Sequence, residues 1–307
     1  MKIQSFNVSV PAPCMNRCKF CVSATRRCEE DVLKIQNDIL DKNEIFHNHF
    51  SEDMWDKNIS YYIDKFDYVS RKCDTLLVTS TGEPMLNKKF IEFIGIVNQI
   101  IETPFRNIEI QTSGLLLNQK NIDFLISKLR VKTISLSLSA LDEELNFRYN
   151  NPVHDKFRLN IKDTCKLIKD NGLNLRLSLT LTDYYNKYDS VDIMGSLFDR
   201  IKNLGADQVT FKSLYESGGN LPEDLWVRKH KANPKIEPLI TEYIRTEGDI
   251  IRRLYTGEYV FSINGMAVVI NKDCMSTKII DDVLRYAILK ANGKIYTKWD
   301  NPASLLF

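Results

Sequence analysis

Three cysteines stand close together near the start of the chain, in the stretch CMNRCKFC at residues 14–21. Their spacing is C-x3-C-x2-C, and the stretch follows an apolar segment, residues 3–10, that reads as a strand ended by prolines. Three thiolates can bind three irons of a four-iron cluster and leave the fourth iron without a protein ligand. Such an open iron suits a small chelating molecule that carries an amine and a carboxylate.

Two other interpretations of these thiols remain open. The chain has seven cysteines, and an odd number does not suggest a disulfide framework. Zinc is possible if Cys28 supplies a fourth thiolate. Structural zinc sites usually combine two C-x2–4-C pairs, however, and only one clear pair, Cys18 and Cys21, is present. The third interpretation is a set of unrelated buried thiols.

Composition excludes several classes of protein. The chain has 307 residues, with 43% hydrophobic and 27% charged side chains, which is an ordinary globular mixture and not that of a disordered chain. The 42 Lys and Arg against 40 Asp and Glu leave a net charge of +2, so we expect no binding to extended nucleic acid. No apolar run approaches the ~20 residues of a membrane span, and no signal-peptide core is visible. We therefore expect a cytoplasmic protein without a membrane partner.

Strand-like and helix-like periodicity alternates over the first 214 residues. Strands are expected at residues 3–10, 75–81, 107–113, 133–140, 174–182 and 208–214. Helices are expected at residues 51–72, 87–101, 118–129, 141–169 (interrupted near 151–152) and 190–204. Six such units predict a parallel sheet with helices outside it, two strands short of a closed eight-stranded barrel. We therefore expect an α/β fold, a partial (β/α)6 TIM-like barrel, with its chemistry at the carboxyl ends of the strands.

The composition changes at residue 216. Residues 216–238 are rich in Gly, Pro and charge and read as a loop or lid, followed by a helix at about 235–255. Asn-Gly pairs at 264–265 and 292–293 predict hairpins over residues 259–271 and 284–299. The sequence thus predicts a barrel core, residues 1–215, and a C-terminal α+β extension with β-hairpins, residues 216–307, that acts as a lid or cap.

The spacing C-x3-C-x2-C, with an aromatic residue before the last Cys, resembles the signature of the radical S-adenosylmethionine (radical SAM) superfamily. The resemblance covers about residues 1–215 and identifies no subfamily. It implies that Cys14, Cys18 and Cys21 hold a 4Fe–4S cluster whose open iron binds SAM. It also implies that one electron, from a donor such as flavodoxin or ferredoxin, cleaves SAM to a 5′-deoxyadenosyl radical that abstracts hydrogen from a substrate. Such chemistry is oxygen-sensitive.

The ends of the second and third expected strands carry further similarities. Gly82, Glu83 and Pro84 resemble the G-E-P variant of the family's "GGE" segment, which meets the SAM amino group. Glycine allows a close backbone approach, and the glutamate offers a carboxylate. Thr112, in QTSG at residues 111–114, is similar to the family's T-N-G strand end, where a hydroxyl lies near SAM. An ordinary strand-end turn is the alternative.

The fourth and fifth expected strands add weaker similarities. SLSLSALD at residues 135–142 is similar to the family's S-L-D-A-L-D strand, which implies SAM contacts for Ser137 and Ser139, the latter in place of an Asp. We place Thr180 near the adenine or the substrate. Arg148, in FRYNNP at 147–152, resembles an R-x-N-x-P step and could pair with the SAM carboxylate. A hydrated polar layer and a solvated helix Arg are the alternatives.

The substrate is open. We expect a small polar or nucleotide-like molecule; a peptide or an RNA is the alternative. An RNA-methylating branch of the family would need a second cysteine late in the chain, and Cys274 is the weak candidate for that catalytic role, against a plain hairpin-end thiol. The non-enzymatic alternatives are a zinc-binding module and an iron–sulfur protein without catalysis. The former predicts zinc without sulfide, and the latter predicts a brown protein that does not bind SAM.

Overall fold

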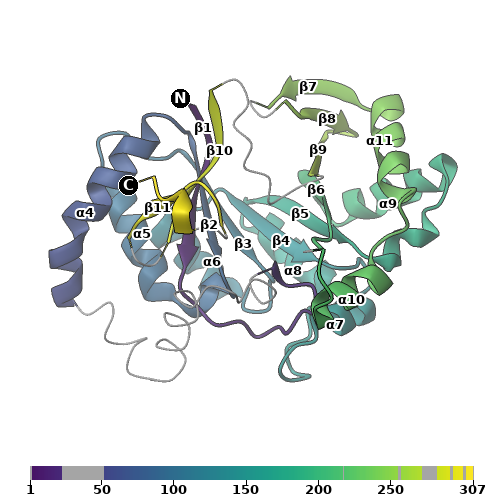
Figure 1. The fold of residues 1–307 in the computed structure, drawn as a ribbon, viewed down its shortest axis with the longest axis horizontal. Helices are drawn as coiled ribbons and strands as arrows, with labels where there is room; N and C mark the ends of the chain where they lie inside the picture. Colours follow the sequence, from purple (N-terminus) through teal and green to yellow (C-terminus); the bar gives the residue numbers. More distant parts are fainter. Residues whose placement is uncertain are drawn as a thin grey trace.

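The computed structural model describes residues 2–22, 52–216, 218–254, 257–271, 282–290, 293–299 and 302–306. These residues form one eleven-stranded sheet in the order β11-β10-β1-β2-β3-β4-β5-β6-β9-β8-β7 (Figure 1). Its middle consists of six parallel strands, each paired with the next: β1 (Lys2–Val10), β2 (Thr75–Ser80), β3 (Asn107–Thr112), β4 (Thr133–Leu138), β5 (Asn174–Leu181) and β6 (Gln208–Ser213). The predicted order and direction of the six strands are confirmed.

Helices cover the outer face of this sheet (Figure 1). They are α4 (Glu52–Ser70), α5 (Lys88–Ile100), α6 (Gln119–Phe124), α7 (Glu143–Asn150), α8 (Ile161–Asp170) and α9 (Val191–Asn203). Several start where a side chain accepts a hydrogen bond from the first turn: Asn87 caps α5, Asn118 caps α6, Asp142 caps α7 and Asn160 caps α8. The fold is therefore the expected α/β class, with an open, largely parallel sheet.

Strand alternation separates an apolar outer layer from a polar inner one. On β4, Ile134, Leu136 and Leu138 are buried in the hydrophobic core, between sheet and helices. The intervening Ser135 lines a cavity on the inner side of the sheet. Because the sheet is curved, the inner faces of its strands surround this cavity and form an incomplete barrel.

The C-terminal segment extends the sheet at both edges. β9 (Met266–Asn271) lies parallel to β6 and continues antiparallel into β8 (Tyr259–Ile263) and β7 (Asp249–Arg253). β10 (Val283–Leu289) lies parallel to β1 and pairs with the short β11 (Ile295–Tyr296). The hairpin predicted at 259–271 is confirmed, with Asn264 and Gly265 at φ 52° and 76°, as its tight turn requires. Of the hairpin predicted at 284–299, the short antiparallel pairing of β10 with β11 is confirmed.

Two expectations for this segment were wrong in detail. Residues 216–238 are not wholly loop, because they contain α10 (Pro222–His230). The helix expected to reach about residue 255 is α11 (Ile236–Glu247), and it stops at Gly248. The next residues form β7, because antiparallel pairing with β8 outweighs the local helical pattern there.

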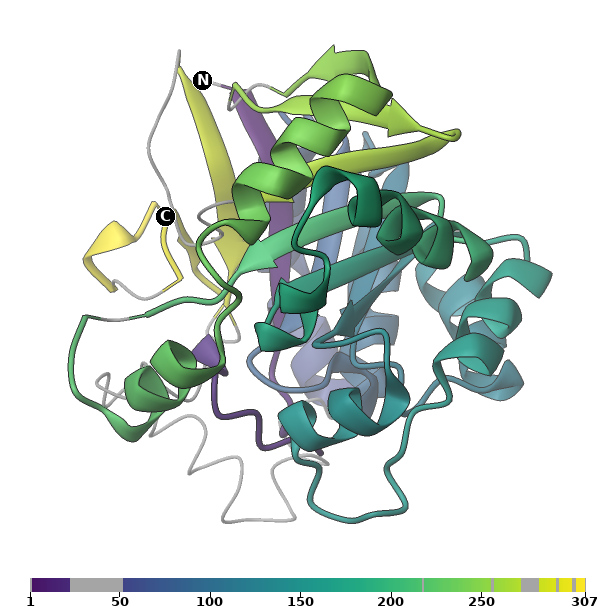
Figure 2. The same cartoon turned by 90° about the vertical axis from the view of Figure 1, so that its right-hand side faces the viewer.

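The two ends of the sheet approach each other at the amino-terminal end of the barrel strands. In both views β7 and β8 lie near the start of β1 and β10 (Figures 1 and 2). Arg285 of β10 forms an ion pair with Glu258, just before β8, at 3.4 Å. The barrel is thus narrowed at this end by a contact between elements that are not paired as strands.

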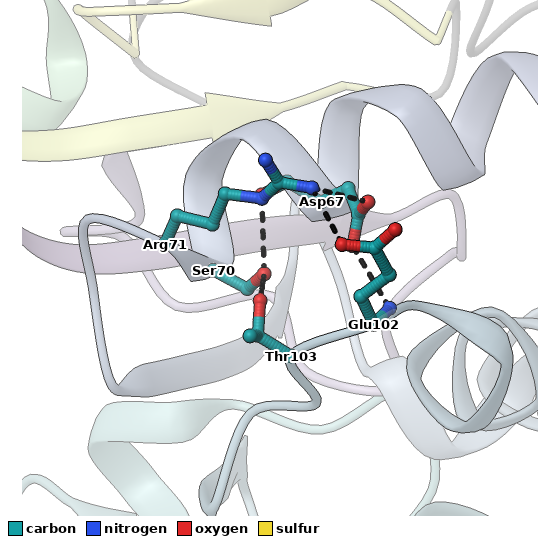
Figure 3. Close-up of polar contacts among 5 residues, drawn as sticks. All are labelled: Asp67, Ser70, Arg71, Glu102 and Thr103. Atoms are coloured by element: carbon teal, nitrogen blue, oxygen red, sulfur yellow. Dashed lines mark hydrogen bonds and ion pairs between the residues drawn. The ribbon is translucent and has the colours of Figure 1, made fainter.

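Exposed polar contacts tie α4 to the segment that follows α5 (Figure 3). Arg71 pairs with Asp67 at 3.2 Å and with Glu102 at 2.9 Å, and the Ser70 and Thr103 hydroxyls lie 2.9 Å apart. Exposed pairs of this kind contribute little individually. Among the described residues, no helix is both long and apolar enough to cross a membrane.

Candidate active site

The cysteine stretch is an extended loop that leaves the carboxyl end of β1 and lines the inner cavity. Cys14 is exposed, whereas Cys18 and Cys21 are partly buried, and all three line the same cavity. The Cys21 N–H donates to the Cys18 carbonyl at 3.2 Å, and the Asn16 N–H donates to the Cys14 sulfur at 3.4 Å. The three predicted ligands are therefore brought together on one wall of the cavity.

The residues after β2 pack closely against the first residues of the cysteine loop and fix their position. A Cβ on Gly82 would lie only 2.3 Å from the carbonyl oxygens of Ala12 and Pro13. The Glu83 N–H donates to the same Pro13 oxygen at 2.8 Å. The missing Cβ of Gly82 therefore lets the backbone of the cysteine loop approach closely, while the expected approach of SAM to this segment stays a prediction.

Two further side chains hold the first carbonyls of the loop. The Ser80 hydroxyl donates to the Val10 carbonyl at 2.7 Å, and the Asn87 amide donates to the Pro11 carbonyl at 2.9 Å. Asn87 also caps α5, so one side chain connects that helix to the loop. The segment 80–87 thus acts as a bracket, and the cysteines extend from a fixed base.

Glu83 is almost fully buried, at 1% exposure, and its carboxylate is hydrogen-bonded inside the protein. It accepts from the Thr112 hydroxyl at 2.7 Å, from the Ser113 N–H at 2.9 Å and from the Ser113 hydroxyl at 2.6 Å. These bonds join the ends of β2 and β3. Pro84, also buried, begins the short helical turn Pro84–Leu86. The structure therefore shows Gly82, Glu83, Pro84 and Thr112 as one connected corner beside the cysteine loop.

The other expected contact residues are more dispersed. Ser139 is buried and donates to the Asn150 side-chain oxygen at 2.8 Å. Ser137 is exposed on the inner side of β4, and Thr180 is half-buried on β5. Arg148 projects from α7 with 68% of its side chain exposed and pairs with Glu144 at 3.1 Å. Of the four, only Ser139 contacts a residue that touches the cysteine loop.

Asn150 is the site residue that sequence reasoning missed. The Cys18 thiol donates to its backbone oxygen at 3.5 Å and its side-chain oxygen at 3.7 Å. The Arg17 N–H donates to the same backbone oxygen at 3.1 Å. Asn150 ends α7, and its signal was the R-x-N-x-P step, of which only the arginine was singled out.

The cavity inside the sheet has a volume of about 1890 Å³, and its wall combines polar and apolar side chains. Strand register places Gln111, Ser135, Arg176 and Gln208 in one layer across β3 to β6. Arg176 forms an ion pair with the buried Glu109 of β3 and donates from Nε to Gln208 at 2.9 Å. A paired charge network therefore spans the cavity wall below the cysteines.

Their surroundings oppose ionisation of Cys14 and Cys18. Although the Cys14 residue as a whole is exposed, partial removal of its sulfur from water raises its pKa to about 11, with smaller contributions from the nearby Glu83 and Cys21. Burial, and then Cys21 and Cys14, raise the pKa of Cys18 well above its usual value. A bound cationic centre would reverse the penalty by stabilising the thiolates.

The donor set fits a four-iron cluster. The described residues contain no group of three His, Cys, Asp or Glu side chains that could hold one metal ion. A four-iron cluster instead takes one thiolate per iron, which three thiols along one wall can supply. The Asn16 side-chain oxygen is buried at the same wall with no partner among the described residues, so it is available to a ligand that donates hydrogen bonds. Cys28 and Cys274 lie outside the described residues.

Comparison with known proteins agrees with this donor set. Residues 8–210 match the family described as the Radical SAM superfamily. No curated protein matches the chain. Among solved structures, SuiB of Streptococcus suis bound to S-adenosylmethionine is 14% identical with a TM-score of 0.56, and the match covers 97% of this chain and 60% of SuiB. The anSMEcpe protein with bound AdoMet is 13% identical with a TM-score of 0.57, over 100% of this chain and 74% of that one.

Proposed function

Because the chain belongs to the radical SAM superfamily, whose enzymes use a 4Fe–4S cluster and SAM, we propose that it cleaves SAM reductively and acts on a small polar or nucleotide-like substrate. The arrangement of Cys14, Cys18 and Cys21 on one cavity wall is the observation that carries this proposal. When bound, the reduced cluster supplies the electron that cleaves SAM, and the resulting 5′-deoxyadenosyl radical abstracts hydrogen from the substrate.

The protein's own residues hold the reactants in place. Segment 80–87 anchors the base of the cysteine loop, and Asn150 holds its middle through the backbone N–H of Arg17. The bond that Asn150 accepts from the Cys18 thiol belongs to the cluster-free protein, because an iron-bound thiolate has no proton to donate. Asn16 offers a buried acceptor beside the thiols, which suits the amine of SAM. Gly82, Glu83, Pro84 and Thr112 form the adjoining corner, and Ser137, Ser139, Arg148 and Thr180 remain proposed contacts along the cavity mouth.

The cavity supports a substrate that forms many hydrogen bonds. Its inner face offers hydroxyl and amide groups, including Ser135, Ser178, Thr210 and Gln111, among apolar side chains. Its volume of about 1890 Å³ exceeds the roughly 300–1,000 Å³ of a typical ligand pocket, so it has room for SAM and a second molecule. We propose that an electron donor of the flavodoxin or ferredoxin type reduces the cluster. We also propose that residues 216–235, which include α10, limit the access of water to the cavity.

A peptide substrate is the second candidate. SuiB has been solved with its precursor peptide SuiA, and that structure has 14% identity and a TM-score of 0.56 to this chain, over 96% of it and 59% of SuiB. The anSMEcpe structures include one with a Cp18Cys peptide. The match covers 97% of this chain and 60% of SuiB, so the chain spans about three fifths of SuiB's length.

The proposal is tested by anaerobic reconstitution, chemical reduction and incubation with SAM. We expect about four irons and four sulfides per chain, and 5′-deoxyadenosine as a product. Cys18→Ala should abolish both colour and product, while Cys165→Ala, a buried thiol on α8, should retain both. Parallel reactions with nucleotides and with short peptides separate the two substrate classes. A cluster-loaded protein that forms no 5′-deoxyadenosine with any candidate would refute the enzyme assignment.

A further inference from the structure

The aromatic residue inside the cysteine motif is covered by a helix from the distant C-terminal part of the chain. Phe20 lies between Cys18 and Cys21, and its ring faces Trp226 of α10 with centroids 5.5 Å apart, tilted by 34°. The neighbouring Leu225 is 55% exposed. The α10 helix therefore contacts the cysteine loop through the Trp226 ring.

The same helix is anchored to the barrel rim one turn later. The His230 ring lies 4.5 Å from Trp226, and its Nδ1 is 3.1 Å from an oxygen of Asp183, just after β5. Tyr149 donates its hydroxyl to the other oxygen of Asp183 and meets the Trp226 ring edge-on at 5.9 Å. Two rings and one carboxylate thus fix the position of Trp226.

Backbone bonds hold the end of α10 on β5. The Ala232 N–H donates to the Leu181 carbonyl at 3.0 Å, and Lys231 forms an isolated bridge with Thr182. Glu216 accepts from Arg228 and, at 3.2 Å, from Lys231, which ties the preceding loop to the helix. The C-terminal end of α10 is therefore the fixed end, and Trp226 extends from it to the cysteine loop.

These contacts meet the cysteine loop from two sides. Tyr149 precedes Asn150, which accepts hydrogen bonds from the Cys18 thiol. On the other side, Trp226 packs on Phe20. The two sides are joined through Asp183 and His230.

We propose that Trp226 is a positioning residue for the cysteine loop, and that Asp183 and His230 hold α10 so that Trp226 can confine Phe20. The proposal rests on the proposed function only in taking Cys18 and Cys21 as cluster ligands. Two cysteines separated by two residues must present both thiols in one orientation to bind neighbouring irons. Confining the ring between them restricts the backbone that sets this orientation, so the loop is ordered before the cluster is assembled.

The test measures thiol access in the metal-free, reduced chain. Iodoacetamide alkylation is followed over time, and mass spectrometry assigns the label to each cysteine. We expect Trp226→Ala to raise the rates at Cys18 and Cys21 roughly fivefold, because access controls thiol reactivity. The rates at the buried Cys73 and Cys165 should stay unchanged. Trp226→Phe should restore most of the protection, and Leu225→Ala, on the same helix, should match the parent.

A second variant guards against general unfolding. His230→Ala leaves the tryptophan in place but removes its tie to Asp183, and it should give a smaller rise confined to the same two thiols. If neither variant gives a rise confined to Cys18 and Cys21, the proposal is wrong. Because the alkylation uses no SAM and no cluster, its outcome is separate from that of SAM cleavage. Failure of the parent to form 5′-deoxyadenosine would refute the proposed function without affecting this result.

Discussion

The thiol of Cys18 hydrogen-bonds to both oxygens of Asn150, at 3.5 Å to the backbone oxygen and 3.7 Å to the side-chain oxygen. The side-chain oxygen also accepts from Ser139 at 2.8 Å, so the end of β4 and the cysteine loop share one acceptor. This contact joins residues 132 positions apart and sets where the middle thiol lies.

Replacing Asn150 tests how this neighbour affects Cys18 once the thiol has lost its proton and binds iron. Asn150→Asp introduces a negative charge beside the thiolate, and a like charge disfavours the ionised ligand. Changes to a residue that contacts a metal ligand typically cost about 10–100-fold in metal affinity, so we expect roughly 10-fold faster loss of iron to a chelator. Asn150→Ala, which removes the side-chain acceptor without adding charge, should have a smaller effect. Equal iron loss from the parent and both variants would show that Asn150 does not support the cluster.

Gly82→Ala tests the bracket beneath the cysteine loop. The added Cβ would lie 2.3 Å from two carbonyl oxygens, so the loop or the β2 end must shift. Overpacking of this kind costs about 1–3 kcal/mol, and we expect that loss in the free energy of unfolding together with reduced iron incorporation. Gly195→Ala on α9 is the matched control, since its Cβ would meet only the flexible Tyr243 side chain, at 3.3 Å. A Gly82→Ala protein as stable and iron-rich as the control would contradict this account.

Glu109→Gln tests the charge network in the cavity. Glu109 is 3% exposed and is the anionic partner of Arg176. Removing one partner of a buried pair leaves a desolvated charge, which typically costs about 3–5 kcal/mol; because Arg176 is partly exposed, we expect about 2–3. Urea unfolding measures the loss, and Glu109→Gln combined with Arg176→Gln should recover part of it. Additive losses in the double variant would mean that the two charges are not coupled.

Tyr62 gives a stability change at alkaline pH. Burial raises the pKa of its hydroxyl to about 12, compared with 10 for an unperturbed tyrosine. A raised pKa in the folded chain means that this contribution is fully present below pH 10 and is lost between pH 10 and 12. A shift of this size corresponds to about 3 kcal/mol in all, of which about 2 kcal/mol is lost between pH 9 and pH 11.5. The free energy of unfolding should therefore fall between pH 9 and pH 11.5 in the parent, and it should fall by about 2 kcal/mol less in Tyr62→Phe. An identical pH dependence in the two proteins would contradict the assignment.

Local patterns predicted the central sheet but not its edges. The six parallel strands alternate apolar and polar residues and are followed by cap or turn residues, so each can be recognised from its own segment. β7 could not, because residues 249–253 continue a helical pattern and become a strand only by pairing with β8. That β10 lies beside β1 likewise depends on pairing across the whole chain, which no local pattern encodes.

The same distinction applies to the site. The cysteine motif and the strand-end residues were recognisable because each is a short segment with a characteristic spacing. Trp226 was not, and Asn150 lay within the R-x-N-x-P step without its role being visible, since the contacts of both with the cysteine loop exist only after α7 and α10 pack against it. The sequence indicated a close backbone approach at Gly82 but not that the cysteine loop itself is what approaches, and the expected contact of this segment with SAM stays a prediction.

The central claim is that Cys14, Cys18 and Cys21 hold a four-iron cluster with one iron open to SAM. It is tested most directly by the electron paramagnetic resonance spectrum of the anaerobically reduced protein, recorded with and without SAM. We predict a reduced-cluster signal whose shape changes when SAM is added, and no such signal in Cys18→Ala. A signal that is unchanged by saturating SAM, or that persists in Cys18→Ala, would contradict the account.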